Sequence, residues 1–161
     1  MDTLISNVTI VTMNERMEVL FGGHVGITDG KIVHIAKVPP KEAPAEIIDG
    51  TGMVLIPGLI NCHTHLATAA LRSLCDELSI TESLQQQLQK EAKMDSRIAK
   101  AAATIAAAEC LRFGTTSVSD LYYYPDATAE VIAESGMKAN LALSSYRCID
   151  AVEEFDFSRD E

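Results

Sequence analysis

Two histidines separated by one residue are the side chains in this sequence best suited to chemistry. His63 and His65 stand at the end of a mostly apolar run over residues 54–62. If that run is a strand, side chains alternate with a period of two, and both imidazoles face the same side. Imidazole is the commonest protein ligand for zinc-like ions, and a catalytic site normally has three protein ligands and an open position. The pair therefore predicts half of a metal site.

The surroundings of the pair favour a metal site over an ordinary strand. A lone His-x-His also serves packing or hydrogen bonding. Here, however, it lies where an apolar run ends and helix-compatible sequence begins, and catalytic residues of an α/β barrel sit at the carboxyl ends of strands. Cys62 should face away from His63, so a Cys-His zinc site is not expected. Gly58, after Pro57, lets the chain enter the strand without a side-chain clash.

The sequence of the N-terminal part predicts short strands. Residues 3–13 are rich in β-branched side chains, and residues 24–38 alternate on both sides of Asp29-Gly30, a strong hairpin signal. We therefore expect a small all-β domain, part of a β-sandwich, over residues 1–56.

Helices and strands alternate in the second predicted domain, residues 57–161. The clearest helix spans residues 96–113 and ends where Gly114 supplies a C-terminal cap. Its predicted buried face carries apolar residues at helical spacing: Ile98, Ala101, Ile105, Ala108 and Leu111.

A second helix is expected over residues 126–135, with Asp126 as its N-cap and Gly136 as its end. Strands are expected at residues 115–122 and 138–145. The resulting β-α-β-α-β order predicts an α/β fold with a parallel sheet, either doubly wound or a barrel.

Composition narrows the class of protein. The 161 residues carry 13 basic and 23 acidic side chains, so the net charge of 13 − 23 = −10 argues against nucleic acid or an anionic membrane as a partner. No stretch reaches the roughly 18 apolar residues of a membrane span, and the first residues lack the features of a signal peptide. Four dispersed cysteines without a C-x-x-C pair fit reduced thiols. These features predict a cytoplasmic protein.

Several segments together resemble a known family. Residues 57–66 (PGLINCHTHL) resemble the first metal-binding strand of the amidohydrolase superfamily, in the branch of methylthioadenosine and S-adenosylhomocysteine deaminases, cytosine deaminases and chlorohydrolase-like triazine enzymes. Residues 72–78, 108–120 and 124–130 also resemble segments of that branch. Hydantoinase-like members usually carry Asp two residues before the first histidine, whereas this chain has Asn61. The resemblance thus favours the deaminase-like branch.

The resemblance implies a TIM-type metal-dependent hydrolase barrel with one divalent ion, zinc by default and iron as the alternative. His63 and His65 would bind it together with a third histidine and an aspartate. Metal-activated water would then attack an electron-poor ring carbon of a small N-heterocyclic substrate such as an aminopurine nucleoside. Since the chain has no histidine after His65, the catalytic residues are expected downstream. The chain is therefore predicted to be an N-terminal fragment, truncated after the opening β/α units and inactive alone.

Two further residues are candidates for substrate binding. By resemblance, Glu91 lies near the position where nucleoside deaminases place a glutamate for the ribose hydroxyls, although Ser83 and Lys90 replace the usual flanking residues. Arg147 could bind a substrate carboxylate bidentately, and a solvated loop arginine is the alternative. Asp120 is expected to orient neighbouring groups rather than to bind metal.

Three readings of the function stay open at this point. The first is hydrolytic deamination, and the second is chloro-triazine or cyclic-amide hydrolysis within the same superfamily. The third is a non-catalytic structural or binding α/β domain in which the two histidines are ordinary strand residues. The expected partners are the small-molecule substrate and either a second copy of the chain or the missing C-terminal part of the barrel.

Overall fold

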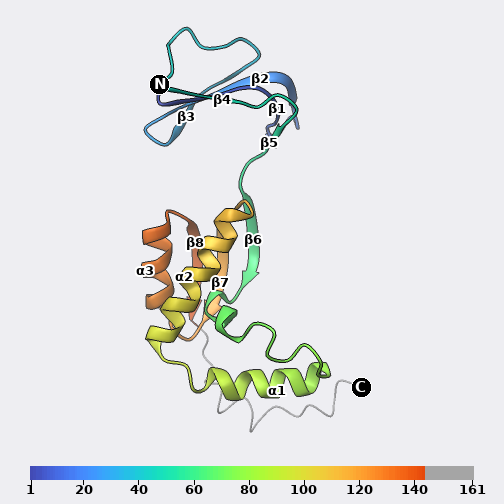
Figure 1. Ribbon diagram of the computed structural model, residues 1–161, viewed down its shortest axis with the longest axis vertical. Helices are drawn as coiled ribbons and strands as arrows, with labels where there is room; N and C mark the ends of the chain where they lie inside the picture. Colours follow the sequence, from blue (N-terminus) through green and yellow to red (C-terminus); the bar gives the residue numbers. More distant parts are fainter. Residues whose placement is uncertain (144–161) are drawn as a thin grey trace. The chain divides into compact units, whose positions relative to one another are not determined.

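The computed structural model describes residues 1–143, and the chain divides into two compact units, Met1–Pro57 and Gly58–Glu161. Figure 1 shows a strand-only first unit and a second unit of strands and helices. Each unit has its own core.

The first unit is a five-stranded sheet in the order β3-β2-β1-β4, with β5 also paired to β1. Val8, Ile10 and Val25 form its core. The predicted hairpin is confirmed: β2 and β3 are antiparallel, and Asp29 and Gly30 both have positive φ angles, of 50° and 68°, as a tight hairpin turn requires. The strands are β1 (Thr3–Val11), β2 (Val19–Thr28), β3 (Lys31–Ala36), β4 (Glu46–Asp49) and β5 (Val54–Leu55).

The second unit contains a three-stranded parallel sheet in the order β6-β7-β8, as the alternating pattern predicted. Helix α2 connects β6 to β7, helix α3 connects β7 to β8, and the two helices lie side by side along the strands (Figure 1). The segment between β6 and α2 holds a short 3₁₀ helix, η1, and helix α1. The bounds are β6 (Leu59–Thr64), η1 (Leu66–Leu71), α1 (Ile80–Glu91), α2 (Ser96–Arg112), β7 (Thr115–Tyr122), α3 (Pro125–Ser135) and β8 (Lys138–Leu143).

Helix α2 is present, but its predicted buried face is wrong. The side chains it buries are alanines on nearly the opposite side of the helix: Ala99, Ala102, Ala103, Ala106 and Ala107. Ile105, predicted to be buried, is 59% exposed. At 3.6 residues per turn, the buried face lies roughly 160° around the helix from the predicted one. Small side chains let the helix backbone approach its neighbours closely.

The start of α3 also differs from the prediction. Its N-cap is Tyr124, and Pro125 occupies the first turn, where the missing N–H costs nothing. Asp126 lies inside the first turn, where a carboxylate interacts favourably with the helix dipole. The predicted end at Gly136 is confirmed, with a φ angle of 74°.

Gly58 allows β6 and β7 to approach closely. A Cβ atom at Gly58 would lie 2.1 Å from Thr116 Oγ1 and 2.5 Å from Thr116 Cγ2. We therefore expect Gly58→Ala to reduce the free energy of unfolding by about 1–3 kcal/mol, the usual cost of overpacking. Urea unfolding measures this change. A double-mutant cycle with Thr116→Ala, which removes the two closest atoms, should show a favourable coupling, and strict additivity would contradict the explanation.

Candidate metal centre

His63 and His65 converge at the carboxyl end of β6. His63 lies in the strand and His65 directly follows it, and their Nε2 atoms are 3.2 Å apart. The two rings are nearly perpendicular, at 86°. Two nitrogen ligands of a tetrahedral zinc ion, each about 2.0–2.1 Å from the metal, lie about 3.3 Å from one another. The spacing of the two Nε2 atoms thus fits a shared ion.

The tautomer of His65 follows from its hydrogen bond. Its Nδ1 atom is 2.6 Å from the carbonyl oxygen of Leu121, and a carbonyl can only accept. Nδ1 therefore carries the proton, and the neutral ring presents its Nε2 lone pair toward His63. A backbone carbonyl behind a histidine is a common way to orient a metal ligand.

Asp120 is buried at the end of β7 and contacts both sequence neighbours of His65. One carboxylate oxygen, Oδ1, accepts hydrogen bonds from the Leu66 amide at 2.6 Å and from the Thr64 hydroxyl at 3.0 Å. These hydrogen bonds are those expected of a residue that orients its neighbours, and that role stays a prediction. The partners of Asp120 were not predictable from the sequence, because they lie 54 and 56 residues away.

The remaining residues around the pair add no further ligand among residues 1–143, where no group of three or more His, Cys, Asp and Glu side chains could hold a metal ion. Asn61 accepts a hydrogen bond from the His63 amide at 3.1 Å. The Cys62 side chain is exposed. The metal-ligating groups that this part of the chain brings together are the two imidazoles.

Glu91 lies in the same pocket as His65. It is the last residue of α1, which begins with a capping box between Ser79 and Glu82. Its carboxylate is buried and accepts a hydrogen bond from Gln87 Nε2 at 2.7 Å. The pocket has a volume of about 180 Å³, and Leu121 and Tyr122 also line it. Arg147, the other predicted substrate-binding residue, lies outside the described residues.

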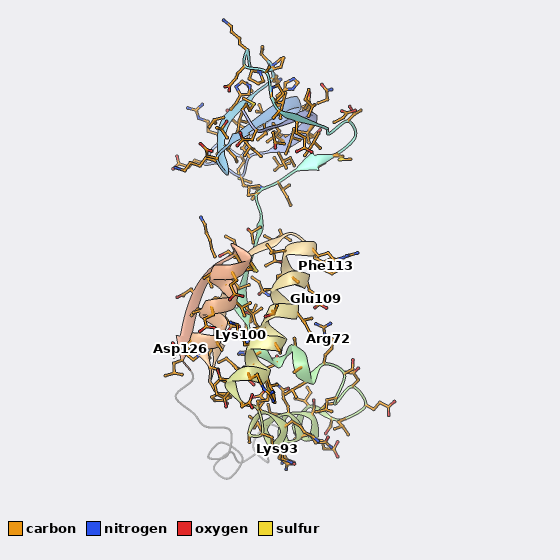
Figure 2. All side chains as sticks on the ribbon, turned by 60° about the vertical axis from the view of Figure 1, so that its left-hand side comes forward. Arg72, Lys93, Lys100, Glu109, Phe113 and Asp126 are labelled. Atoms are coloured by element: carbon orange, nitrogen blue, oxygen red, sulfur yellow. The ribbon has the colours of Figure 1, made fainter. Side chains whose placement is uncertain are left out.

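An ion pair that sequence reasoning missed joins the end of η1 to α2. Arg72 donates two hydrogen bonds to Glu109, at 2.9 and 2.5 Å, and Figure 2 shows the two side chains next to one another. The Arg72 guanidinium lowers the pKa of the Glu109 carboxyl. No local spacing signals this pair, since the residues are 37 positions apart. It fastens the segment after the histidines to the helix that covers the sheet.

None of the helices within residues 1–143 combines the length and the apolar character that a membrane crossing requires.

Comparison with known proteins identifies the class of fold. Residues 54–154 match the amidohydrolase family. An atrazine chlorohydrolase from Arthrobacter aurescens TC1, solved in complex with zinc, superposes with a TM-score of 0.78 at 28% identity, over 89% of this chain and 36% of that one. An adenosine deaminase from Xanthomonas campestris with bound zinc gives a TM-score of 0.76 at 32% identity, over 86% and 33%.

Curated relatives agree with this result. A 5'-deoxyadenosine deaminase of Methanosarcina mazei is 36% identical over 88% of this chain and 33% of its own length. A 5-methylthioadenosine/S-adenosylhomocysteine deaminase of Thermococcus onnurineus is 39% identical over 93% of this chain and 34% of its own.

The chain belongs to the amidohydrolase family. The fold class predicted from the sequence is confirmed: the second unit forms opening β/α units of a TIM-type hydrolase barrel. The chain spans about a third of the length of the curated relatives it matches.

Proposed function

We propose that this chain forms the N-terminal part of a zinc-dependent amidohydrolase that deaminates an adenosine-like nucleoside. The observation that carries the proposal is the pair of Nε2 atoms 3.2 Å apart at the end of a parallel strand. Relatives named as deaminases, at 36% and 39% identity, support the choice of reaction. The proposed setting is the cytoplasm, because the cysteines are dispersed and lack a C-x-x-C pair.

In this proposal the residues of the chain have separate roles. His63 and His65 hold the ion through Nε2, and the Leu121 carbonyl keeps the proton of His65 on Nδ1. A bound divalent ion supplies the Lewis acidity that turns water into a nucleophile near neutral pH. Glu91 accepts hydrogen bonds from the ribose hydroxyls, since its buried carboxylate lines the pocket that His65 also lines. Iron remains the alternative ion, because it accepts the same ligands.

A second candidate is hydrolysis of a chlorinated triazine. The specific observation in its favour is the TM-score of 0.78 with the zinc-containing atrazine chlorohydrolase. Deamination is preferred because the curated relatives named above share more of their sequence with this chain than the 28% of the chlorohydrolase.

A chimera tests the function. Residues 1–161 would replace the matching N-terminal third of the Thermococcus onnurineus deaminase, and release of ammonia from methylthioadenosine and of chloride from atrazine would be measured. We expect zinc-dependent release of ammonia that a chelator removes and added zinc restores. Release of chloride alone would support the second candidate.

The control is the same chimera with both histidines replaced by alanine. A folded, monodisperse chimera that hydrolyses neither compound with zinc or iron would contradict the proposal and favour a non-catalytic domain. Circular dichroism and size-exclusion chromatography establish folding before activity is measured.

A further inference from the structure

We propose that Asp120 and Thr64 are positioning residues that hold His65 in its metal-binding orientation. This inference rests on the proposed metal-binding role of His65. The backbone of His65 has left strand β6 and forms the N-cap of η1 with φ −136° and ψ 75°. The ladder of β6 ends at Thr64, so the strand alone does not fix the direction of the imidazole.

Asp120 anchors the chain on both sides of His65. Thr64 and Asp120 are register partners in the parallel pairing of β6 with β7. The same carboxylate oxygen accepts from the Thr64 hydroxyl before His65 and from the Leu66 amide after it. A carboxylate accepts stronger hydrogen bonds than a neutral oxygen. The residues on both sides of the histidine are therefore tied to one buried carboxylate, Thr64 through its side chain and Leu66 through its backbone amide.

Thr64 adds a second link. Its hydroxyl has a single proton and lies 3.0 Å from two acceptors, the Ser119 carbonyl and Asp120 Oδ1. Together with the bond from His65 Nδ1 to the Leu121 carbonyl, residues 64–66, at the end of β6 and directly after it, are held by three consecutive residues of β7. The Leu121 carbonyl can accept the hydrogen bond from His65 Nδ1 only while the backbone of His65 stays in place. Loss of Asp120 should therefore free the imidazole ring as well.

The alternative is that Asp120 merely stabilises the fold. A carboxylate only 3% exposed is costly to bury and would be replaceable by an apolar side chain if packing were its only purpose. A positioning role predicts that loss of Asp120 changes the tautomer and metal affinity of His65, whereas a purely stabilising role predicts a change in stability only. The test therefore measures the tautomer of His65 and its metal affinity beside the melting temperature.

The test uses the chimera with the Thermococcus onnurineus deaminase, because the completed barrel supplies the metal ligands that are expected downstream of this chain. Asp120→Ala removes the acceptor, Asp120→Asn keeps an oxygen in place, Thr64→Val removes the hydroxyl, and Thr64→Ser keeps it. Tyr124→Phe is the matched control, because its hydroxyl donates to the Met94 carbonyl at 2.6 Å without touching residues 64–66. Cobalt(II) affinity is measured by competition with a chromophoric chelator, and the His65 tautomer by long-range ¹H–¹⁵N NMR without metal.

We expect Asp120→Ala to weaken cobalt binding by about 10–100-fold, the range found when a group that orients a metal ligand is removed. Its His65 spectrum should change from the Nδ1–H form to a mixture of tautomers. Thr64→Val should act in the same direction with a smaller effect, while Asp120→Asn and Thr64→Ser should restore most of the affinity. Tyr124→Phe should lower the melting temperature and leave the cobalt affinity and the His65 tautomer unchanged.

A folded Asp120→Ala chain that melts earlier but keeps wild-type affinity and the Nδ1–H tautomer would overturn the inference. If Asp120→Ala does not fold, unchanged affinity and tautomer in folded Thr64→Val would overturn it equally. Failure of the wild-type chimera to bind cobalt through His63 and His65 would contradict the proposed function instead. The tautomer measured without metal would still decide whether Asp120 positions the ring.

Discussion

Replacing either His63 or His65 by alanine is expected to remove the metal ion from the completed barrel and to abolish hydrolysis. Each variant loses one of the two imidazoles whose Nε2 atoms converge. Loss of a ligand should exceed the about 10–100-fold weakening that follows from loss of a group behind a ligand. The measurement is the metal content of the purified chimera by mass spectrometry, together with its rate of ammonia release.

His34→Ala is the matched control for this experiment. His34 is half-buried in β3 of the first unit, and its Nε2 atom lies 2.9 Å from the Val38 carbonyl, so its loss removes an imidazole and one hydrogen bond that do not belong to β6. We expect its metal content and activity to stay unchanged. Full metal content in the His63 and His65 variants would instead assign these histidines to ordinary strand positions.

The second large effect concerns the 161-residue chain by itself, which we expect to self-associate and to show no turnover. Within the described residues, β6 and β8 each pair only with β7, so each leaves one edge of the sheet open. Open edges with apolar side chains promote association. Ile60, for example, is 70% exposed. Analytical ultracentrifugation over a range of concentrations measures the association.

Ile60→Lys should reduce the association, because a charge on an edge strand opposes pairing. Ile105→Lys is the control: it places the same charge at an isoleucine of α2 that is 59% exposed, away from the strand edge. A stable monomer that binds zinc with micromolar affinity and turns over substrate would contradict the expectation for the isolated chain.

Local patterns were sufficient to predict the strand at residues 115–122, the hairpin at Asp29-Gly30 and the end of α3 at Gly136, because each depends on a few neighbouring residues. The orientation of α2 was not predictable in this way. Ile98 and Ile105 dominate the hydrophobic pattern, but alanines allow closer packing, and this advantage exists only once the partner surfaces are in place.

In the candidate site, too, the features that depend on local sequence were predictable and the contacts between distant residues were not. The spacing of His63 and His65 is local, and it pointed to two side chains that the structure brings together. The groups that hold them, the Leu121 carbonyl and the Asp120 carboxylate, come from a strand more than 50 residues later. A single sequence carries no signal for such pairings. The resemblance placed Glu91 near the substrate, and the pocket it shares with His65 supports that proposal.

The bonds between residues 64–66 and β7 also bear on the order of folding. The partners are 54 to 56 residues apart, so closing that loop must precede the paired arrangement of the two imidazoles. A nascent chain that has completed β6 alone would carry the His-x-His sequence without its geometry. Metal capture should therefore be a late kinetic event that reports on docking of β7, and part of the binding free energy would appear as folding free energy.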